Sequence, residues 1–180
     1  METIIQQIAL DLAKKITEKA ILGGIFDIDA LASETLGECR RSAVAMIETI
    51  CANLNHRMRE DKAGRKAQGL VLKEKDRPRR LLTELGFLNI PRDYYYDKFT
   101  GRYISLLDHV MNIRAYDRVG NNLSAAMVSL ATDMSYAKSA AIASEGILSR
   151  QTVKNHIQKL GALEMQYQGT EKKSVKELHV

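Results

Sequence analysis

Apolar residues recur at the spacing of an amphipathic helix through the first 60 residues of the chain. Between residues 3 and 22 they form one stripe, which Gly23 and Gly24 end. A second helical pattern begins after Asp27 and continues to about Glu60. We therefore expect a hairpin of two long helices over residues 1–61, packed within one chain or paired with a second copy. The two stripes contain Ile4, Ile5, Ile8, Leu12, Ile16 and Ala20, then Ala43, Met46, Ile47, Ile50 and Leu54.

From residue 81 to residue 107 the composition becomes typical of β-strands, with many Phe, Ile and Tyr residues. Residues 97–101, Asp-Lys-Phe-Thr-Gly, are typical of a hairpin loop in which Gly101 takes a positive φ. We predict two or three antiparallel strands. Pro91 lacks a backbone N–H, so we expect this part to lie at an edge or a bend.

Three consecutive tyrosines, Tyr94 to Tyr96, lie in this predicted strand region. Successive side chains of a strand point to opposite faces, so at least one ring faces solvent or a ligand. Rings beside basic residues can stack on nucleic-acid bases, and packing in a core or an interface is the alternative. The neighbouring basic residues are Arg92, Lys98 and Arg102.

Helical spacing returns after residue 107. We predict a short helix around residues 109–113 and a longer one from Asn121 or Asn122. Residues 135–160 are then typical of two short helices joined at Gly146, with Ser135 and Ser149 as N-caps. We expect the Ser149 side chain to accept from the amide of residue 151 or 152. The predicted apolar faces of these three helices contain Leu123, Met127, Leu130 and Met134, then Ala137, Ala140 and Ala141, then Val153, Ile157 and Leu160.

The outer face of the last helix is polar, and no acidic residue occurs between Arg150 and Leu160. Arginine and lysine bind guanine or phosphate, and Gln and Asn pair with adenine. Three helices in this order are typical of a helix-turn-helix, so we predict that the last helix enters the major groove of DNA. The alternative is an ordinary helix pair with a solvated face, because the connection of five residues exceeds the compact turn of about 3–4. The predicted DNA-binding residues are Arg150, Gln151, Thr152, Lys154, Asn155 and Gln158.

Positive charge is concentrated in one segment of a chain whose formal net charge is +5. The first 38 residues contain seven acidic and three basic side chains, whereas residues 56–80 contain four acidic and ten basic ones. Residues 62–80 show little apolar periodicity, and we predict a basic linker there. Such a linker either follows a phosphate backbone without sequence preference or is merely solvated. The predicted phosphate contacts are Lys66, Arg79 and Arg80.

Several functional classes find no support in the sequence. Cys39 and Cys51 are twelve residues apart without a CxxC pattern, so we expect reduced thiols rather than a zinc site. No apolar run approaches the ~20 residues of a membrane span, and no secretion signal is evident, so we expect a cytoplasmic protein. We predict no catalytic residue and no metal ligand, because the sequence contains no phosphate-binding loop, nucleophile elbow or HExxH motif.

Three segments occur together and in order, namely RDYYYDKFTGRYISLLD, DMSYAKSAAIAS and SRQTVKNHIQKL. With them, residues 79–180 resemble the insertion-sequence transposases of the ISLre type, a bacterial family long catalogued as uncharacterised. The resemblance implies the DNA-binding N-terminal part of a transposase, which recognises mobile-element ends and precedes a ribonuclease-H-like catalytic domain. In that family a Lys-rich strand like KKSVKELHV runs into the first catalytic aspartate, so residues 164–180 are expected to be the truncated start of that domain.

The sequence thus predicts a mainly α protein with a small antiparallel β-hairpin unit, of the α+β class. The expected divisions are a helical hairpin at 1–61, a basic linker at 62–80, a β-hairpin plus helix-turn-helix unit at 81–163, and residues 164–180. The expected partners are duplex DNA and a further copy or a full-length transposase, with no membrane. We expect no cofactor in this chain, Mg²⁺ only in a full-length enzyme, and no strand cleavage by the chain alone. The alternative is a protein-interaction or oligomerisation module without sequence-specific DNA binding.

Overall fold

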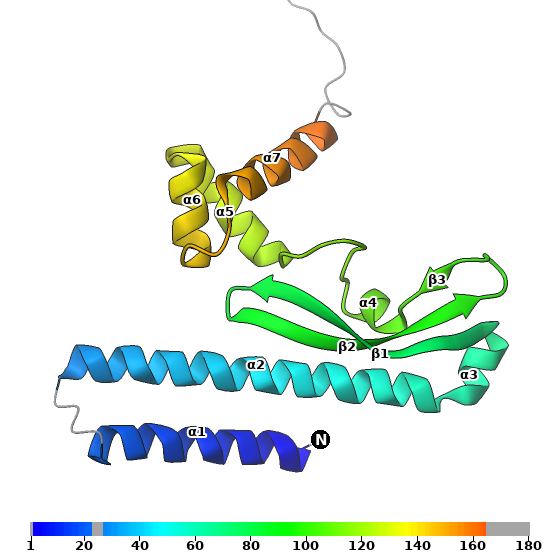
Figure 1. Cartoon of the computed structure of the whole chain (residues 1–180), viewed down its shortest axis with the longest axis horizontal. Coiled ribbons are helices and arrows are strands. Elements are labelled where there is room, and N and C mark those ends of the chain that lie inside the picture. The colour runs from blue at the N-terminus through cyan, green and yellow to red at the C-terminus, as the bar shows by residue number, and fades with distance from the viewer. Residues whose placement is uncertain (1, 23–26, 165–180) are drawn as a thin grey trace, which may run out of the picture. The chain divides into compact units, whose positions relative to one another are not determined.

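The computed structural model describes residues 2–22 and 27–164 and has the predicted α+β composition (Figure 1). The chain divides into two compact units, Met1–Gly120 and Asn121–Val180, called unit 1 and unit 2 below. Within the described ranges, no helix combines the length and the apolar character needed to cross a membrane. The segment predicted to begin a catalytic domain, 164–180, lies outside the described residues except for Glu164.

Unit 1 begins with the predicted helical hairpin, α1 (Glu2–Leu22) and α2 (Ile28–Glu60), which lie side by side in Figure 1. Asp27 caps α2 by accepting from the amides of Asp29 and Ala30. Between the helices, Lys19 donates to Glu34 at 2.6 Å and lies 3.0 Å from Glu38. Most of the predicted α1 stripe is partly buried, namely Ile5, Ile8, Leu12, Ile16 and Ala20, but Ile4 is exposed. Gly23 and Gly24 lie outside the described residues.

A three-stranded antiparallel sheet in the order β1-β2-β3 covers α2. Its strands are β1 (Leu70–Thr83), β2 (Gly86–Asp97) and β3 (Tyr103–Ile104). The predicted loop after Asp97 is present, and Gly101 has a φ of +68°. Pro91 lies opposite Pro78 of β1. Among the described strands, β3 pairs with β2 only at Tyr95 and Tyr96, so the other side of β2 is unpaired at Pro91.

The core of unit 1 forms where α2 meets the sheet and α4 (Leu106–Val110). The helix α4 begins at Leu106, three residues earlier than the sequence predicted, because the side chain of the N-cap Ser105 accepts from the Asp108 amide. The buried thiol of Cys51 lies in this core, and its pKa is raised by burial. The buried members of the core are Cys51, Leu81, Leu88, Ile90 and Leu107.

The predicted linker at 62–80 is wrong. This stretch forms the short helix α3 (Lys62–Ala67) and most of β1. Residues 73–78 are exposed, so this part of the strand shows no alternation of apolar and polar residues. Its backbone forms a strand because it pairs with β2. The predicted boundary at residue 80 is also wrong, because the sheet packs on α2 and belongs to unit 1.

Unit 2 is a three-helix cluster of α5 (Asn121–Asp133), α6 (Tyr136–Ser144) and α7 (Arg150–Glu164), which confirms the predicted trihelical arrangement. One residue from each helix is fully buried at the centre, namely Met127, Ala140 and Val153. Part of the predicted apolar faces is wrong, because Ala137, Ala141 and Leu160 are exposed. The α6 positions that are buried beside Ala140 are Ser139 and Ser144.

Candidate nucleic-acid interface

The helix α7 buries one stripe and exposes the predicted DNA-binding face. Val153 is fully buried and Ile157 is partly buried. Since residues three and four apart share a face of a helix, the opposite side is left to solvent. The exposed members of the predicted set are Arg150, Gln151, Lys154, Asn155 and Gln158, whereas Thr152 is half-buried.

Ser144 organises the turn that leads into α7. Its hydroxyl donates to the carbonyl of Ala140 at 2.7 Å and accepts from the amide of Leu148 at 2.8 Å. Glu145 and Gly146 both have positive φ, and the Gly146 amide closes α6 on the Ala141 carbonyl. These bonds hold the five-residue connection 145–149 in one conformation, so the start of α7 has a defined direction within unit 2.

The first turn of α7 differs from the predicted cap. The Ser149 hydroxyl lies 3.3 Å from the Thr152 hydroxyl, and the Thr152 amide donates to the Ser149 carbonyl. The predicted bond from a backbone amide to the Ser149 side chain is therefore wrong. Thr152 itself is half-buried, and its hydroxyl faces that of Ser149.

Gln151 and Asn155 form a linked pair on the exposed face. Gln151 Nε2 donates to Asn155 Oδ1 at 2.9 Å, which aligns the two amides one turn apart. The pair leaves Asn155 Nδ2 as a donor and Gln151 Oε1 as an acceptor. These two groups are complementary to N7 and N6 on the major-groove edge of adenine.

Two polar contacts that the sequence did not reveal tie the three helices together. His156 Nδ1 of α7 lies 2.5 Å from Ser124 Oγ of α5. The buried Ser139 of α6 donates to the carbonyl of Met127 in α5. These hydrogen bonds join the helices of the core that carries the polar face of α7.

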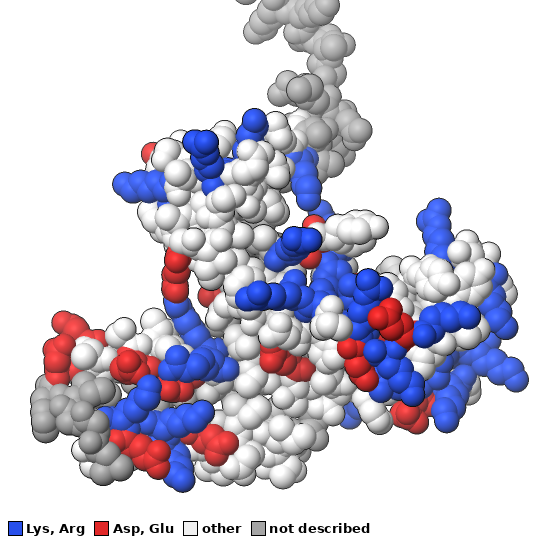
Figure 2. Space-filling model, viewed as in Figure 1, with Lys and Arg blue, Asp and Glu red and all other residues white. Residues whose placement is uncertain are grey.

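The basic residues predicted as phosphate contacts in unit 1 have different environments. Arg79 is only 7% exposed, and its guanidinium pairs with Asp108 at 3.1 Å. The prediction that Arg79 freely follows a phosphate backbone is therefore wrong. Lys66 is exposed on α3, and Arg80 is exposed on β1 with its guanidinium 3.6 Å from the centre of the Phe87 ring. Figure 2 shows Lys and Arg side chains gathered over α3 and the sheet.

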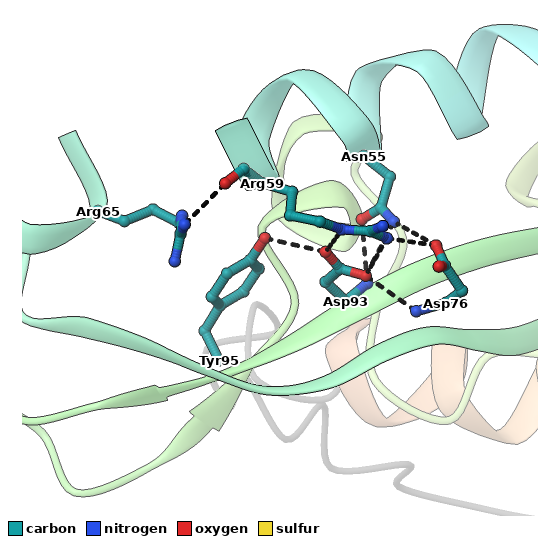
Figure 3. Close-up of polar contacts among 6 residues, drawn as sticks. All are labelled: Asn55, Arg59, Arg65, Asp76, Asp93 and Tyr95. Carbon is teal, nitrogen blue, oxygen red and sulfur yellow. Dashed lines mark hydrogen bonds and ion pairs between the residues drawn. The ribbon is translucent and has the colours of Figure 1, made fainter. Parts of the chain in front are cut away.

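A buried polar network joins α2 to the sheet (Figure 3). Arg59 Nε donates to Asp93 Oδ2 at 2.7 Å, and Asn55 Nδ2 donates to Asp93 Oδ1 at 3.1 Å. The backbone amide of Asp76 and the hydroxyl of Tyr95 also donate to the Asp93 carboxylate. Burial raises the pKa of Asp93, but the charge of Arg59 and the hydrogen bonds from Arg59, the Asp76 amide and Asn55 outweigh burial and hold the pKa below its usual value.

This network is structural in character. Five hydrogen bonds from four residues converge on one carboxylate, since Arg59 donates through both Nε and Nη2, so Asp93 has no free oxygen for a ligand or a proton transfer. Burial also raises the pKa of Tyr95 to about 12, which keeps its phenol neutral. In residues 2–22 and 27–164, no group of three or more His, Cys, Asp or Glu side chains is placed to hold a metal ion. Cys39 and Cys51 both carry free thiols.

Comparison with known proteins finds one matching family model and several relatives that carry the name of the same family. The model of the family described as "Uncharacterised protein family (UPF0236)" matches residues 23–180. The UPF0236 protein TTE0610/TTE0881/TTE1053/TTE2432 of Caldanaerobacter subterraneus subsp. tengcongensis is 33% identical over 186 residues, covering 99% of this chain and 38% of that relative. No solved structure matches the chain.

Two further relatives come from the same organism. UPF0236 protein TTE2489 is 36% identical over 134 residues, which cover 74% of this chain and 28% of that protein. A third relative is 32% identical over 184 residues, which cover 99% of this chain and 38% of that protein. Its name is UPF0236 protein TTE0033/TTE0744/TTE0838/TTE0852/TTE1082/TTE1247/TTE1519/TTE1678/TTE1739/TTE1823/TTE2212. The chain therefore spans less than two-fifths of the length of these relatives.

Proposed function

The chain belongs to the UPF0236 family, and we propose that it is the DNA-binding part of an insertion-sequence transposase of the ISLre type. One observation carries the proposal: α7 presents an exposed, acid-free row of Arg, Gln, Lys and Asn side chains on a trihelical core. These are the side-chain types that bind base edges and phosphates in the major groove. The duplex recognised is a mobile-element end.

The names of the relatives support a mobile element. The name of one relative combines eleven designations, from TTE0033 to TTE2212, for a protein of one organism. Occurrence at many loci of a genome is the pattern that self-copying elements leave. In this proposal strand cleavage, with its Mg²⁺, belongs to the part of such relatives that this chain does not cover.

A second function, protein interaction or self-association, is favoured by apolar side chains on the surface of unit 1. Phe99 and Tyr103 are 78% and 63% exposed at the β2–β3 hairpin, and Leu10, Ile28 and Leu36 are exposed on α1 and α2. A surface of this kind suits a further copy of the chain or a full-length transposase. It requires no base reading by α7, so the two functions are separable by experiment.

Sequence selection by α7 is testable with the whole chain. Duplexes are selected from a random library, and Kd is then measured by gel shift for the selected duplex and a shuffled one. Replacing Gln151 or Asn155 by Ala removes a bidentate base contact worth about 1–3 kcal/mol. We therefore expect each variant to lose affinity for the selected duplex and to keep its affinity for the shuffled duplex.

The matched control is Gln6→Ala, which removes an exposed amide of the same kind from α1. It should bind both duplexes like the unaltered chain. An equal loss on both duplexes for the Asn155 variant would refute base reading at that position. Failure of the unaltered chain to enrich any duplex would favour the interaction module instead.

A further inference from the structure

Unit 1 contains an open pocket of about 580 Å³ on the β1–β2 sheet, and all of its lining residues belong to unit 1. Its volume lies in the range of small-molecule and cofactor sites, roughly 300–1,000 Å³. The lining combines guanidinium groups with aromatic rings and has Asp117 as its acidic member. The lining residues used below are Arg77, Arg80, Arg92, Arg118, Phe87 and Tyr116.

The arginines of this pocket carry more positive charge than the nearby carboxylates balance. Asp108, which is not part of the lining, accepts from both Arg79 and Arg92. The lining contains five arginines, and the carboxylates available to balance them are Asp108, Asp117 of the lining and Glu74. Arg77 pairs with Glu74 at 3.3 Å, but both side chains are about half exposed, so the pair is weak. An anion that entered the pocket would therefore meet an uncompensated positive field.

Aromatic rings lie against three of these guanidiniums. Arg80 lies 3.6 Å over the Phe87 ring, and Arg77 and Arg92 lie 5.1 and 4.9 Å from the centre of the Tyr94 ring. A guanidinium stacked on a ring keeps its N–H edge available for phosphate oxygens. A side chain that already rests against a ring loses less entropy when a ligand binds.

Tyr116 stands at the edge of the pocket on a pinned loop. It is 98% exposed and has a φ of +66°, which is uncommon for a residue other than glycine. Arg79 holds the loop on either side by donating to the carbonyls of Arg114 at 2.6 Å and Asp117 at 2.7 Å. A large ring kept in solvent on a fixed loop suits a stacking platform better than a packing element.

We propose that this pocket binds an unpaired nucleotide of a nucleic-acid strand. The phosphate accepts hydrogen bonds from Arg77 and Arg118, and the base stacks on Tyr116 and on the outer face of the Arg80 guanidinium. Both interactions tolerate any base, so the site binds single strands without sequence choice. The site adds to duplex reading by α7 and uses other residues, so it does not rest on that proposal.

The test measures Kd of the whole chain for a fluorescein-labelled single-stranded thymidine oligonucleotide, by anisotropy over a range of salt concentrations. Loss of one stacked base weakens binding by about 5- to 150-fold, so we expect a decrease in this range for Tyr116→Ala and little change for Tyr116→Phe. Replacing Arg77 or Arg118 by Ala should lower the salt slope by about 0.7 for each lost phosphate contact. Arg57→Ala removes an exposed arginine of α2 that does not line the pocket, and it should not change Kd.

A spectroscopic variant provides a second readout. The chain contains seven tyrosines and no tryptophan, so Tyr116→Trp introduces a single indole reporter. We expect the oligonucleotide to quench this fluorescence by stacking and heparin, a polyanion without bases, to leave it unchanged. Unaltered single-strand affinity in folded Tyr116→Ala, or equal quenching by heparin, would overturn the nucleotide site. Duplex selection through Asn155 is read on a different probe, so either proposal can fail alone.

Discussion

At the scale of single residues, Asp93 shows how one buried charge holds two elements together. Its side chain is fully buried, and it receives hydrogen bonds from Arg59 and Asn55 of α2 and from the Asp76 amide of β1. A buried carboxylate is tolerated only when such partners replace its hydration. The network therefore sets how the sheet docks on α2.

We expect Asp93→Asn to lower the free energy of unfolding by about 3 kcal/mol at pH 7, because it leaves Arg59 without its buried partner. The effect depends on pH. The folded-state pKa of Asp93 is below its ordinary value of 3.8, so its contribution is fully present above about pH 4. As the pH falls through the lowered folded-state pKa, the carboxylate becomes protonated and that contribution is lost.

Urea unfolding at pH 7 and at pH 2.5 checks this, with Asp133→Asn as a control that changes an exposed aspartate of α5. The difference in free energy of unfolding between the unaltered chain and the Asp93 variant should be smaller at pH 2.5 than at pH 7. A difference in free energy of unfolding that stays constant or increases at pH 2.5 would show that the charge of Asp93 does not stabilise the fold.

At the scale of elements, the helices α1, α2, α5 and α7 were predictable because each buries a periodic apolar stripe, whereas the short α3 was not predicted. The stripe of α1 and the central positions Met127 and Val153 follow the apolar pattern directly. The strand β1 was not predictable, because residues 73–78 are exposed and its order comes from pairing with β2, which no local pattern reveals. In α6 the buried positions include Ser139 and Ser144, whose hydroxyls bond to backbone carbonyls, so polarity misled the prediction.

The candidate sites divide in the same way. The exposed face of α7 lies on one helix, so spacing alone predicted Arg150, Lys154 and Asn155 as neighbours. The pocket of unit 1 gathers residues from β1, β2 and the loop after α4. Its assembly depends on strand register, such as Arg77 opposite Arg92, and on the loop that Arg79 holds.

The bonds of Arg79 lead to an expectation opposite to that of a free phosphate contact. Arg79→Ala removes an ion pair and two bonds to carbonyls, so we expect it to destabilise the fold by about 2–4 kcal/mol. It should also release the loop 114–118, whose exposed Arg114 and Arg118 then become faster sites for trypsin.

Urea unfolding and timed trypsin digestion of the whole chain check both effects, with Arg57→Ala as the matched arginine control. Unchanged stability and unchanged cleavage after Arg114 would mean that Arg79 is not the support of this loop.

At the scale of the whole molecule, each unit has a core of its own. The cluster around Cys51, Ile90 and Leu107 belongs to unit 1, and the cluster around Met127, Ala140 and Val153 belongs to unit 2. The two proposed nucleic-acid sites follow this division, with the arginine pocket in unit 1 and the α7 face in unit 2. Under these two proposals, substitutions in unit 1 and in unit 2 should alter single-strand binding and duplex binding one at a time.

The division also predicts how stability is distributed along the chain. Ile90→Ala should cost about 2–5 kcal/mol and Val153→Ala about 1–3 kcal/mol, because each leaves a cavity in a closely packed core. Because each unit closes its own core, we expect the Val153 variant to lose amide protection in residues 121–164 and to keep it in residues 28–120. The Ile90 variant should show the reverse.

Hydrogen–deuterium exchange of the whole chain, followed by peptide mass spectrometry, reports both ranges in one experiment, with Gln6→Ala as a surface control. Loss of protection spread evenly over both ranges in either variant would mean that the units unfold as one cooperative body, and effects on duplex and single-strand binding would then no longer be separable by core mutations.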